Sequence, residues 1–157
     1  MAIEFNFEND FDLNPQEKYA IWLEKAIANK EFELSELNYI FFDDHQLLEL
    51  NQNYLNHDTY TDIITFDNAE EESTIESDIF ISIDRVKENA ASFDASFEQE
   101  LRRVMAHGVL HLLGFGDKTE AEKQIMREQE EMWVSEFWIK DYDRSITKSI
   151  TSQSNYR

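Results

Sequence analysis

The chain has 157 residues and a formal net charge of −20, with 41% hydrophobic and 31% charged residues. This length suits one domain with its own core, and 12 Phe, 6 Tyr and 3 Trp exclude disorder throughout. The negative charge argues against sequence-independent coating of nucleic acid, and the lack of cysteine excludes disulfides and thiolate metal sites. No apolar run approaches the roughly 20 residues of a membrane helix, and no basic residue precedes Lys18. We therefore expect a cytoplasmic protein with no secretory signal and no membrane partner.

The first third of the chain alternates strand and helix signals. Apolar residues at every second position predict a half-buried strand over residues 3–7. Asn14, as a side-chain cap, and Pro15, at the first helical position, predict a helix that runs to residue 29. Residues 37–42 are apolar on both faces, so we expect this strand to be central in its sheet. Asp43 and Asp44 then cap a helix that carries Leu47, Leu48, Leu50 and Tyr54.

The middle of the chain contains two further strand signals. β-Branched and aromatic residues predict a strand over 61–66, and residues 77–83 predict another. The acidic stretch between them, 67–76, is expected to be a surface loop. Asp84 is expected to cap a helix through about residue 92.

Two longer helices follow. The first is predicted from about Ser96 to Leu113 and should stop at Gly114, because glycine tolerates the left-handed conformation that ends helices. The second runs from Thr119, where Glu122 completes a capping box, to about Lys140. Their core candidates are Phe97, Leu101, Val104, Met105, Leu112, Ile125, Met126, Trp133, Phe137 and Trp138. The sequence therefore predicts a single α+β domain over 1–143 and a polar, flexible tail over 144–157.

The segment HGVLHLLGFGD contains two histidines at helical spacing. His107 and His111 are four residues apart, so both imidazoles lie on one face of a helix and can bind one metal ion. A tight Zn²⁺ site needs a third protein ligand, with water in the open position. Gly114 ends the helix and Phe115-Gly116 let the chain turn back, which makes Asp117 the expected third ligand. The alternative is a half-exposed pair of histidines that holds no metal.

Gly108, which follows the first histidine, bears on the chemistry. Glycine inside a helix costs roughly 1 kcal/mol relative to alanine, so it indicates close backbone approach or room for a ligand. Zinc metallopeptidases share the two-histidine spacing but have a glutamate at this position as the general base. A metallopeptidase would need a carboxylate from elsewhere, so this function is the less favoured alternative.

The 107–117 motif resembles the signature of the YbeY family of rRNA maturation factors and endoribonucleases. Residues 50–66 (LNQNYLNHDTYTDIITF) are similar to the family block LN-x-x-Y-R…D-x-P-T-D-V-L-S-F, and residues 77–83 are similar to its GDI-x-I-S block. The resemblance covers roughly residues 35–140. It implies a mixed four-stranded sheet with surrounding helices and a zincin-like metal helix. It also implies a zinc-dependent, single-strand endoribonuclease that acts in 16S rRNA 3′-end maturation and ribosome quality control.

Two positions depart from the family pattern. The family holds zinc with three histidines in H-x3-H-x5-H, and Asp117 stands at the third. A carboxylate there lowers the net charge of the site, so a bound ion acidifies its water less. Leu55 stands where the family has an arginine that supports catalysis. His57 is the nearest group able to donate to a phosphate, although a histidine in a loop can equally be merely exposed.

Other residues are candidates for the substrate groove. Thr61 and Asp62 could line it, or could simply begin a strand; Tyr54, Tyr60 and Phe115 could stack on bases, or pack in the core. The sequence identifies no general base. The expected partners are rRNA in the small ribosomal subunit, with ribosome-assembly proteins as further candidates, and not DNA. The remaining alternative is a ribosome-associated factor whose metal site is structural or weakly active.

Overall fold

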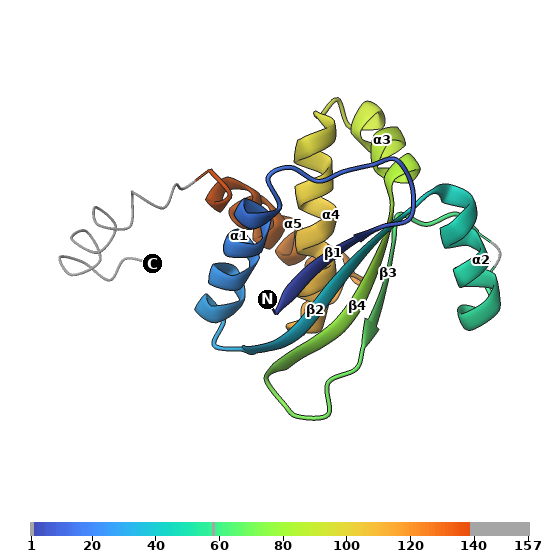
Figure 1. The fold of residues 1–157 in the computed structure, drawn as a ribbon. Helices are drawn as coiled ribbons and strands as arrows, with labels where there is room; N and C mark the ends of the chain where they lie inside the picture. The colour runs from blue at the N-terminus through green and yellow to red at the C-terminus, as the bar shows by residue number, and fades with distance from the viewer. Residues whose placement is uncertain (1, 58, 139–157) are drawn as a thin grey trace.

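The computed structural model describes residues 2–57 and 59–138 (Figure 1). The expected domain end at residue 143 and the expected tail over 144–157 lie outside the described residues. The last described helix ends at Glu136, with Phe137 as its C-cap, which is earlier than the predicted end at about Lys140.

Four strands form one mixed sheet in the order β1-β2-β4-β3. The strands β1 (Ile3–Phe7), β2 (Glu33–Phe42) and β4 (Thr74–Ser82) are parallel, and β3 (Ile63–Asp67) is antiparallel to β4. The strand β2 lies between two neighbours, as its apolar character on both faces predicts. The predicted α+β class with a mixed four-stranded sheet is confirmed.

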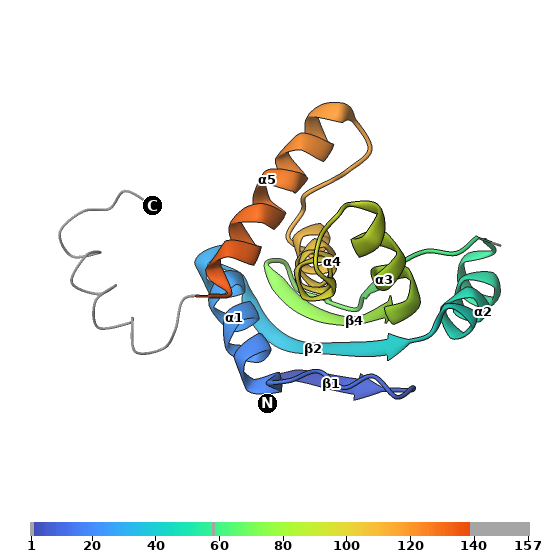
Figure 2. The same cartoon turned by 90° about the horizontal axis from the view of Figure 1, so that it is seen from above.

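Five helices accompany the sheet in the described residues: α1 (Gln16–Asn29), α2 (Asp44–Leu55), α3 (Ile83–Ser92), α4 (Phe97–Leu112) and α5 (Glu120–Glu136). All but α2 lie on one side of the sheet, and α2 lies beyond the ends of β2 and β4 (Figure 2). Helix α4 packs between the sheet and α5. None of the described helices combines the length and apolar composition needed to cross a bilayer.

Three local predictions are wrong. Part of the acidic stretch 67–76 belongs to β4, because Thr74 pairs with Glu33 in the extended β2. Ser82, not Asp84, caps α3, since the Ser82 hydroxyl accepts a hydrogen bond from the Arg85 N–H at 3.2 Å. Helix α1 begins at Gln16 without a side-chain cap, because Pro15 occupies the N-cap position and Asn14 lies one residue before it. The Asn14 amide donates to Asp12 at 3.0 Å.

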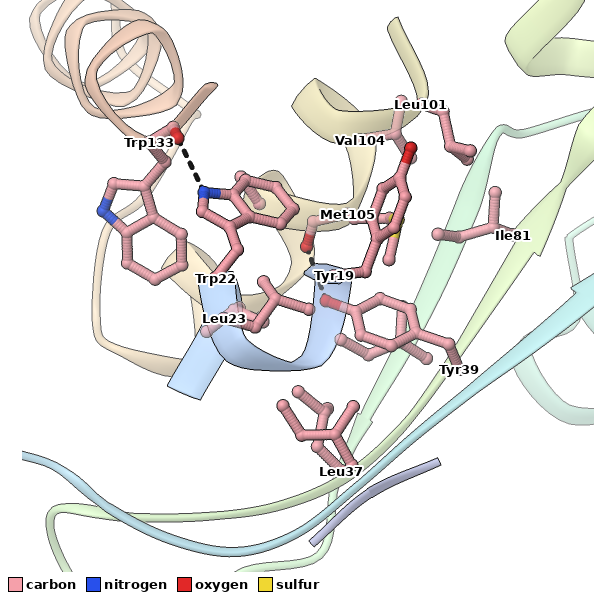
Figure 3. Close-up of a cluster of buried hydrophobic side chains, with 14 of the residues drawn as sticks. Tyr19, Trp22, Leu23, Leu37, Tyr39, Ile81, Leu101, Val104, Met105 and Trp133 are labelled. Atoms are coloured by element: carbon pink, nitrogen blue, oxygen red, sulfur yellow. Dashed lines mark hydrogen bonds between the residues drawn. The ribbon is translucent and has the colours of Figure 1, made fainter. Parts of the chain in front are cut away.

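The core lies between the sheet and the helices α1, α4 and α5 (Figure 3). Two buried aromatic residues bridge these elements through hydrogen bonds. The Trp22 indole donates to the Trp133 carbonyl at 2.7 Å, and the Tyr39 hydroxyl donates to the Met105 carbonyl at 2.9 Å. Burial raises the pKa of Tyr39, so its hydroxyl stays protonated as a donor. The second bond ties β2 to the middle of α4 and so helps to fix the helix on the sheet.

Most core candidates of the last two helices are buried or half-buried, but two are not. Ile125 is 48% exposed and Trp138 is 59% exposed, so their predicted burial is wrong. Helix α5 packs on its neighbours through a single stripe, which contains Met126, Glu130 and Trp133. Ile125 lies off this stripe, and Trp138 lies beyond the end of the helix.

Candidate metal centre

Helix α4 carries His107 and His111 in its last two turns. The helix begins at Phe97, close to its predicted start, and Ser96 caps it through a capping box with Gln99. The two imidazole rings lie on one side of the helix with centroids 4.5 Å apart. The rigid helix therefore sets the separation of the two rings before any ligand is bound.

Gly108 lets α4 approach the sheet closely. A Cβ atom at this position would lie 2.9 Å from Ile63 Cδ1 and 3.1 Å from Ile79 Cδ1. Of the two explanations for a glycine here, the structure supports close backbone approach to β3 and β4. The position at which metallopeptidases have their glutamate thus faces the packed sheet.

The turn after α4 brings Asp117 back to the histidines. Gly114 has φ +104°, the left-handed conformation predicted for the helix end. The turn is then joined to α5, because the Glu122 carboxylate accepts hydrogen bonds from the N–H groups of Lys118 and Thr119 at 3.0 and 3.1 Å. These bonds lower the pKa of Glu122. The predicted capping box of Thr119 and Glu122 is present and braces the turn that carries Asp117.

The three side chains converge on one point. His107 Nε2 lies 3.0 Å from His111 Nε2, and Asp117 Oδ2 lies 3.2 Å from His111 Nε2 and 3.5 Å from His107 Nε2. A tetrahedral ion with bonds of about 2.0–2.1 Å would hold its ligand atoms about 3.3 Å apart. The observed triangle is close to one face of such a tetrahedron, so the donor set fits a zinc ion without rearrangement. His107, His111 and Asp117 thus form a group that could hold a metal ion.

The convergence point opens onto a cleft of about 520 Å³. The side chains of His107, His111 and Asp117 are 19%, 34% and 41% exposed, so solvent reaches the group from one side. The opposite wall is formed by β3 and by the two residues that precede it, Thr61 and Asp62. Together the lining residues are Thr61, Asp62, Ile63, Thr65, Asp67, His107, His111, Leu112 and Asp117.

The structure places only some of the other candidates at this cleft. Thr61 and Asp62 line it, but the remaining candidates are absent from its described lining. Leu55 lies at the end of α2 and is 41% exposed, and His57 is exposed just beyond it. Tyr54 and Tyr60 are exposed at 72% and 58%, and Phe115 is half-buried against the core.

Sequence reasoning missed the acidic and basic residues behind His107. Glu130 of α5 is 4% exposed, and its Oε2 lies 2.6 Å from His107 Nδ1. Arg103 donates from Nη1 to Glu130 Oε1 at 3.2 Å and also pairs with the buried Glu100. Two signals were available. A glutamate interrupts the apolar stripe of α5, and residues 100, 103, 107 and 111 form a polar stripe along α4.

Arg103 is the cation of this buried cluster. Burial by itself lowers the pKa of Arg103, but the hydrogen bonds and charges of Glu100 and Glu130 outweigh it and raise the pKa. The guanidinium therefore stays charged between two carboxylates that have little access to water. Its Nη2 also lies 4.0 Å from Asp62 Oδ2, which connects the cluster to the cleft wall.

Comparisons with known proteins agree with this architecture. The family model described as Endoribonuclease YbeY matches residues 4–138. The chain is 48% identical to Endoribonuclease YbeY of Christiangramia forsetii over 87% of this chain and 95% of that protein. It is 47% identical to Endoribonuclease YbeY of Flavobacterium psychrophilum over 88% of this chain and 98% of that protein. The solution structure of TM1509 from Thermotoga maritima superposes with a TM-score of 0.61 at 26% identity, covering 97% of this chain and 95% of that one. The chain therefore belongs to the YbeY family of endoribonucleases.

Proposed function

We propose that the protein is a zinc-dependent endoribonuclease that cleaves single-stranded RNA, with one Zn²⁺ held by His107, His111 and Asp117. The observation that carries this proposal is the convergence of these three ligand atoms on an open cleft, in a chain whose relatives are named endoribonucleases. The donor set of two imidazoles and a carboxylate is one that zinc binds in catalytic sites. When bound, the ion supplies Lewis acidity, which stabilises charge on a phosphodiester and lowers the pKa of a water.

The charges of the cleft support a cation at this point. Asp62, Asp67 and Asp117 line the cleft, and no lysine or arginine is among its described lining residues. Such a surface repels a phosphodiester unless a cation offsets the carboxylates. Productive contact with RNA at this cleft therefore depends on metal.

The size of the cleft supports an unpaired substrate. Its volume of about 520 Å³ is that of a site for a small ligand. A nucleotide-sized group can enter it, but a base-paired helix cannot.

We further propose that the substrate is the 3′ end of 16S rRNA in the small ribosomal subunit, in the cytoplasm. A chain with a net charge of −20 gains little long-range attraction from RNA. We therefore expect the ribosome, or ribosome-assembly proteins, to present the RNA to the cleft. Binding to free RNA should therefore be weak.

The metallopeptidase alternative is disfavoured by the position of Gly108. Glycine supplies no carboxylate at the position of the peptidase general base, and a larger side chain there would require Ile63 and Ile79 to shift. The other alternative, a ribosome-associated factor with a structural metal, draws support from Leu55, which stands in place of the family arginine and lies outside the described cleft lining.

A cleavage assay tests the enzymatic proposal. Metal-stripped protein is incubated with an end-labelled RNA, either single-stranded or annealed to its complement, with and without one equivalent of Zn²⁺. We expect cleavage of the single strand only, and only with metal. His111→Ala should reduce cleavage to background, whereas His45→Ala, which changes an exposed histidine on α2, should cleave like the parent. Equal cleavage by His111→Ala, or cleavage unaffected by removing metal, would refute the proposal.

A second experiment separates the enzyme from the structural factor. Cells carry His111→Ala or His45→Ala as their single copy of the gene, and the 3′ ends of 16S rRNA are mapped. Unprocessed ends in the His111→Ala cells alone support hydrolysis at this site. Normal ends in both strains, with the variant folded and present, would instead favour the ribosome-associated factor.

A further inference from the structure

We propose that Glu130, oriented by Arg103, is a positioning residue that holds His107 in the tautomer able to bind metal through Nε2. This inference rests on the proposed metal site. It concerns residues of α4 and α5 that lie behind the cleft and do not reach the reacting groups.

The contact between Glu130 and His107 assigns the proton on the ring. Glu130 Oε2 lies 2.6 Å from His107 Nδ1, and both groups are largely shielded from water. An ionised carboxylate can only accept, so Nδ1 must carry the hydrogen. In a neutral ring the lone pair is then on Nε2, the atom that faces His111 and Asp117. A carboxylate behind a metal-binding histidine both fixes the tautomer and raises the basicity of the ligand.

Arg103 determines how the Glu130 carboxylate is oriented. Its Nη1 donates to Glu130 Oε1 at 3.2 Å, so each oxygen of this glutamate has its own partner. Arg103 is itself held by two contacts to Glu100, which is 2% exposed. A guanidinium has donors only and cannot change that role. The side of residue 130 that faces Arg103 must therefore always present an acceptor.

This arrangement predicts an unusual result for Glu130→Gln, a change of nearly the same shape. Arg103 requires the amide oxygen on its own side, so the amide NH₂ must face His107 Nδ1. The ring can accept that hydrogen bond only by moving its proton to Nε2, which is the atom that should bind the metal. The substitution should therefore do more than remove a charge, because it selects the wrong tautomer.

The ring tautomer is measured first, in metal-free protein. Long-range ¹H–¹⁵N correlation spectra at about pH 8.5, above the ordinary range of imidazole titration, distinguish the two tautomers of His107. We expect Nδ1–H in the wild type and Nε2–H in Glu130→Gln. Finding Nε2–H in the wild type would overturn the inference, whether or not the variant folds and whether or not zinc binds.

Zinc affinity is measured second, by competition with a chromophoric chelator. Loss of an outer partner of a metal ligand typically costs 10–100-fold in affinity, and we expect Glu130→Gln to lose about 100-fold. The matched control is Glu131→Gln, which changes the exposed neighbouring glutamate on α5 and should bind like the wild type. Circular dichroism of each metal-free variant checks the fold. A folded Glu130→Gln variant with wild-type affinity would also refute the inference.

The two measurements separate this inference from the proposed function. If the wild type binds no zinc, the proposed function fails, and the tautomer spectrum still decides the role of Glu130. If the wild type binds zinc but His107 carries its proton on Nε2, only the positioning role fails.

Discussion

Replacing Asp117 with alanine should abolish the stabilisation of the protein by zinc and leave the metal-free fold intact. The side chain of Asp117 is 41% exposed, and it contacts His107 and His111 at the cleft. A substitution at such a surface position usually changes stability by no more than about 0.5 kcal/mol. The metal-free variant should therefore unfold at nearly the wild-type temperature.

The effect of zinc can be estimated by mass action. An ion that binds only the native state stabilises it by about 2.7 kcal/mol when its free concentration is 100 times the Kd. For a chain of this length, that corresponds to a rise in Tm of roughly 5–10 °C. With Asp117 removed, two imidazoles remain, and two ligands rarely hold Zn²⁺ tightly. The rise in Tm should then disappear at the same zinc concentration.

The assay is thermal unfolding in chelator and in zinc, with bound metal counted by elemental analysis. Asp67→Ala is the matched control, because Asp67 lines the same cleft but lies outside the three-residue group. We expect the control to keep both the bound ion and the rise in Tm. If Asp117→Ala retains one tightly bound zinc and the wild-type rise in Tm, the assignment of Asp117 as a ligand is incorrect.

Further predictions concern stability. Gly108→Glu, which introduces the glutamate of metallopeptidases, should destabilise the fold by about 1–3 kcal/mol in urea unfolding, because its Cβ would lie 2.9 Å from Ile63 Cδ1 and 3.1 Å from Ile79 Cδ1 and both side chains must shift; an unchanged midpoint would contradict the packing described for α4. Tyr39→Phe should cost about 1 kcal/mol through loss of the buried hydrogen bond to Met105, and no loss would mean that this bond is replaced. Glu122→Gln should unfold at a lower Tm than the wild type above pH 4.5, because the pKa of Glu122 is lowered in the folded state and its stabilisation is present above the unfolded value. This difference should shrink as the pH falls through the folded-state pKa, and a difference that grows on acidification would contradict the sign.

Features that depend on neighbouring residues could be predicted from the sequence alone. The capping boxes at Ser96 and Thr119 and the helix end at Gly114 each use atoms within a few residues of one another. The spacing of His107 and His111 is likewise fixed by one turn of helix, whatever the rest of the chain does. Because Gly114 ends the helix so close to Asp117, even the third candidate ligand could be identified from local geometry.

Features that depend on packing between distant segments required the tertiary structure. The far wall of the cleft comes from β3, which reaches His107 only because the strand pairs with β4 at the edge of the sheet. Glu130 meets His107 because α5 packs across α4, and a separation of 23 positions along the chain allows many other crossings of the two helices. A glutamate in an apolar stripe can be recognised in a sequence, but its partner cannot, since a buried charge is satisfied by whichever group the packing brings to it. The sequence thus determined which atoms could bind a metal, and the packing of α5 on α4 decided which residues orient them.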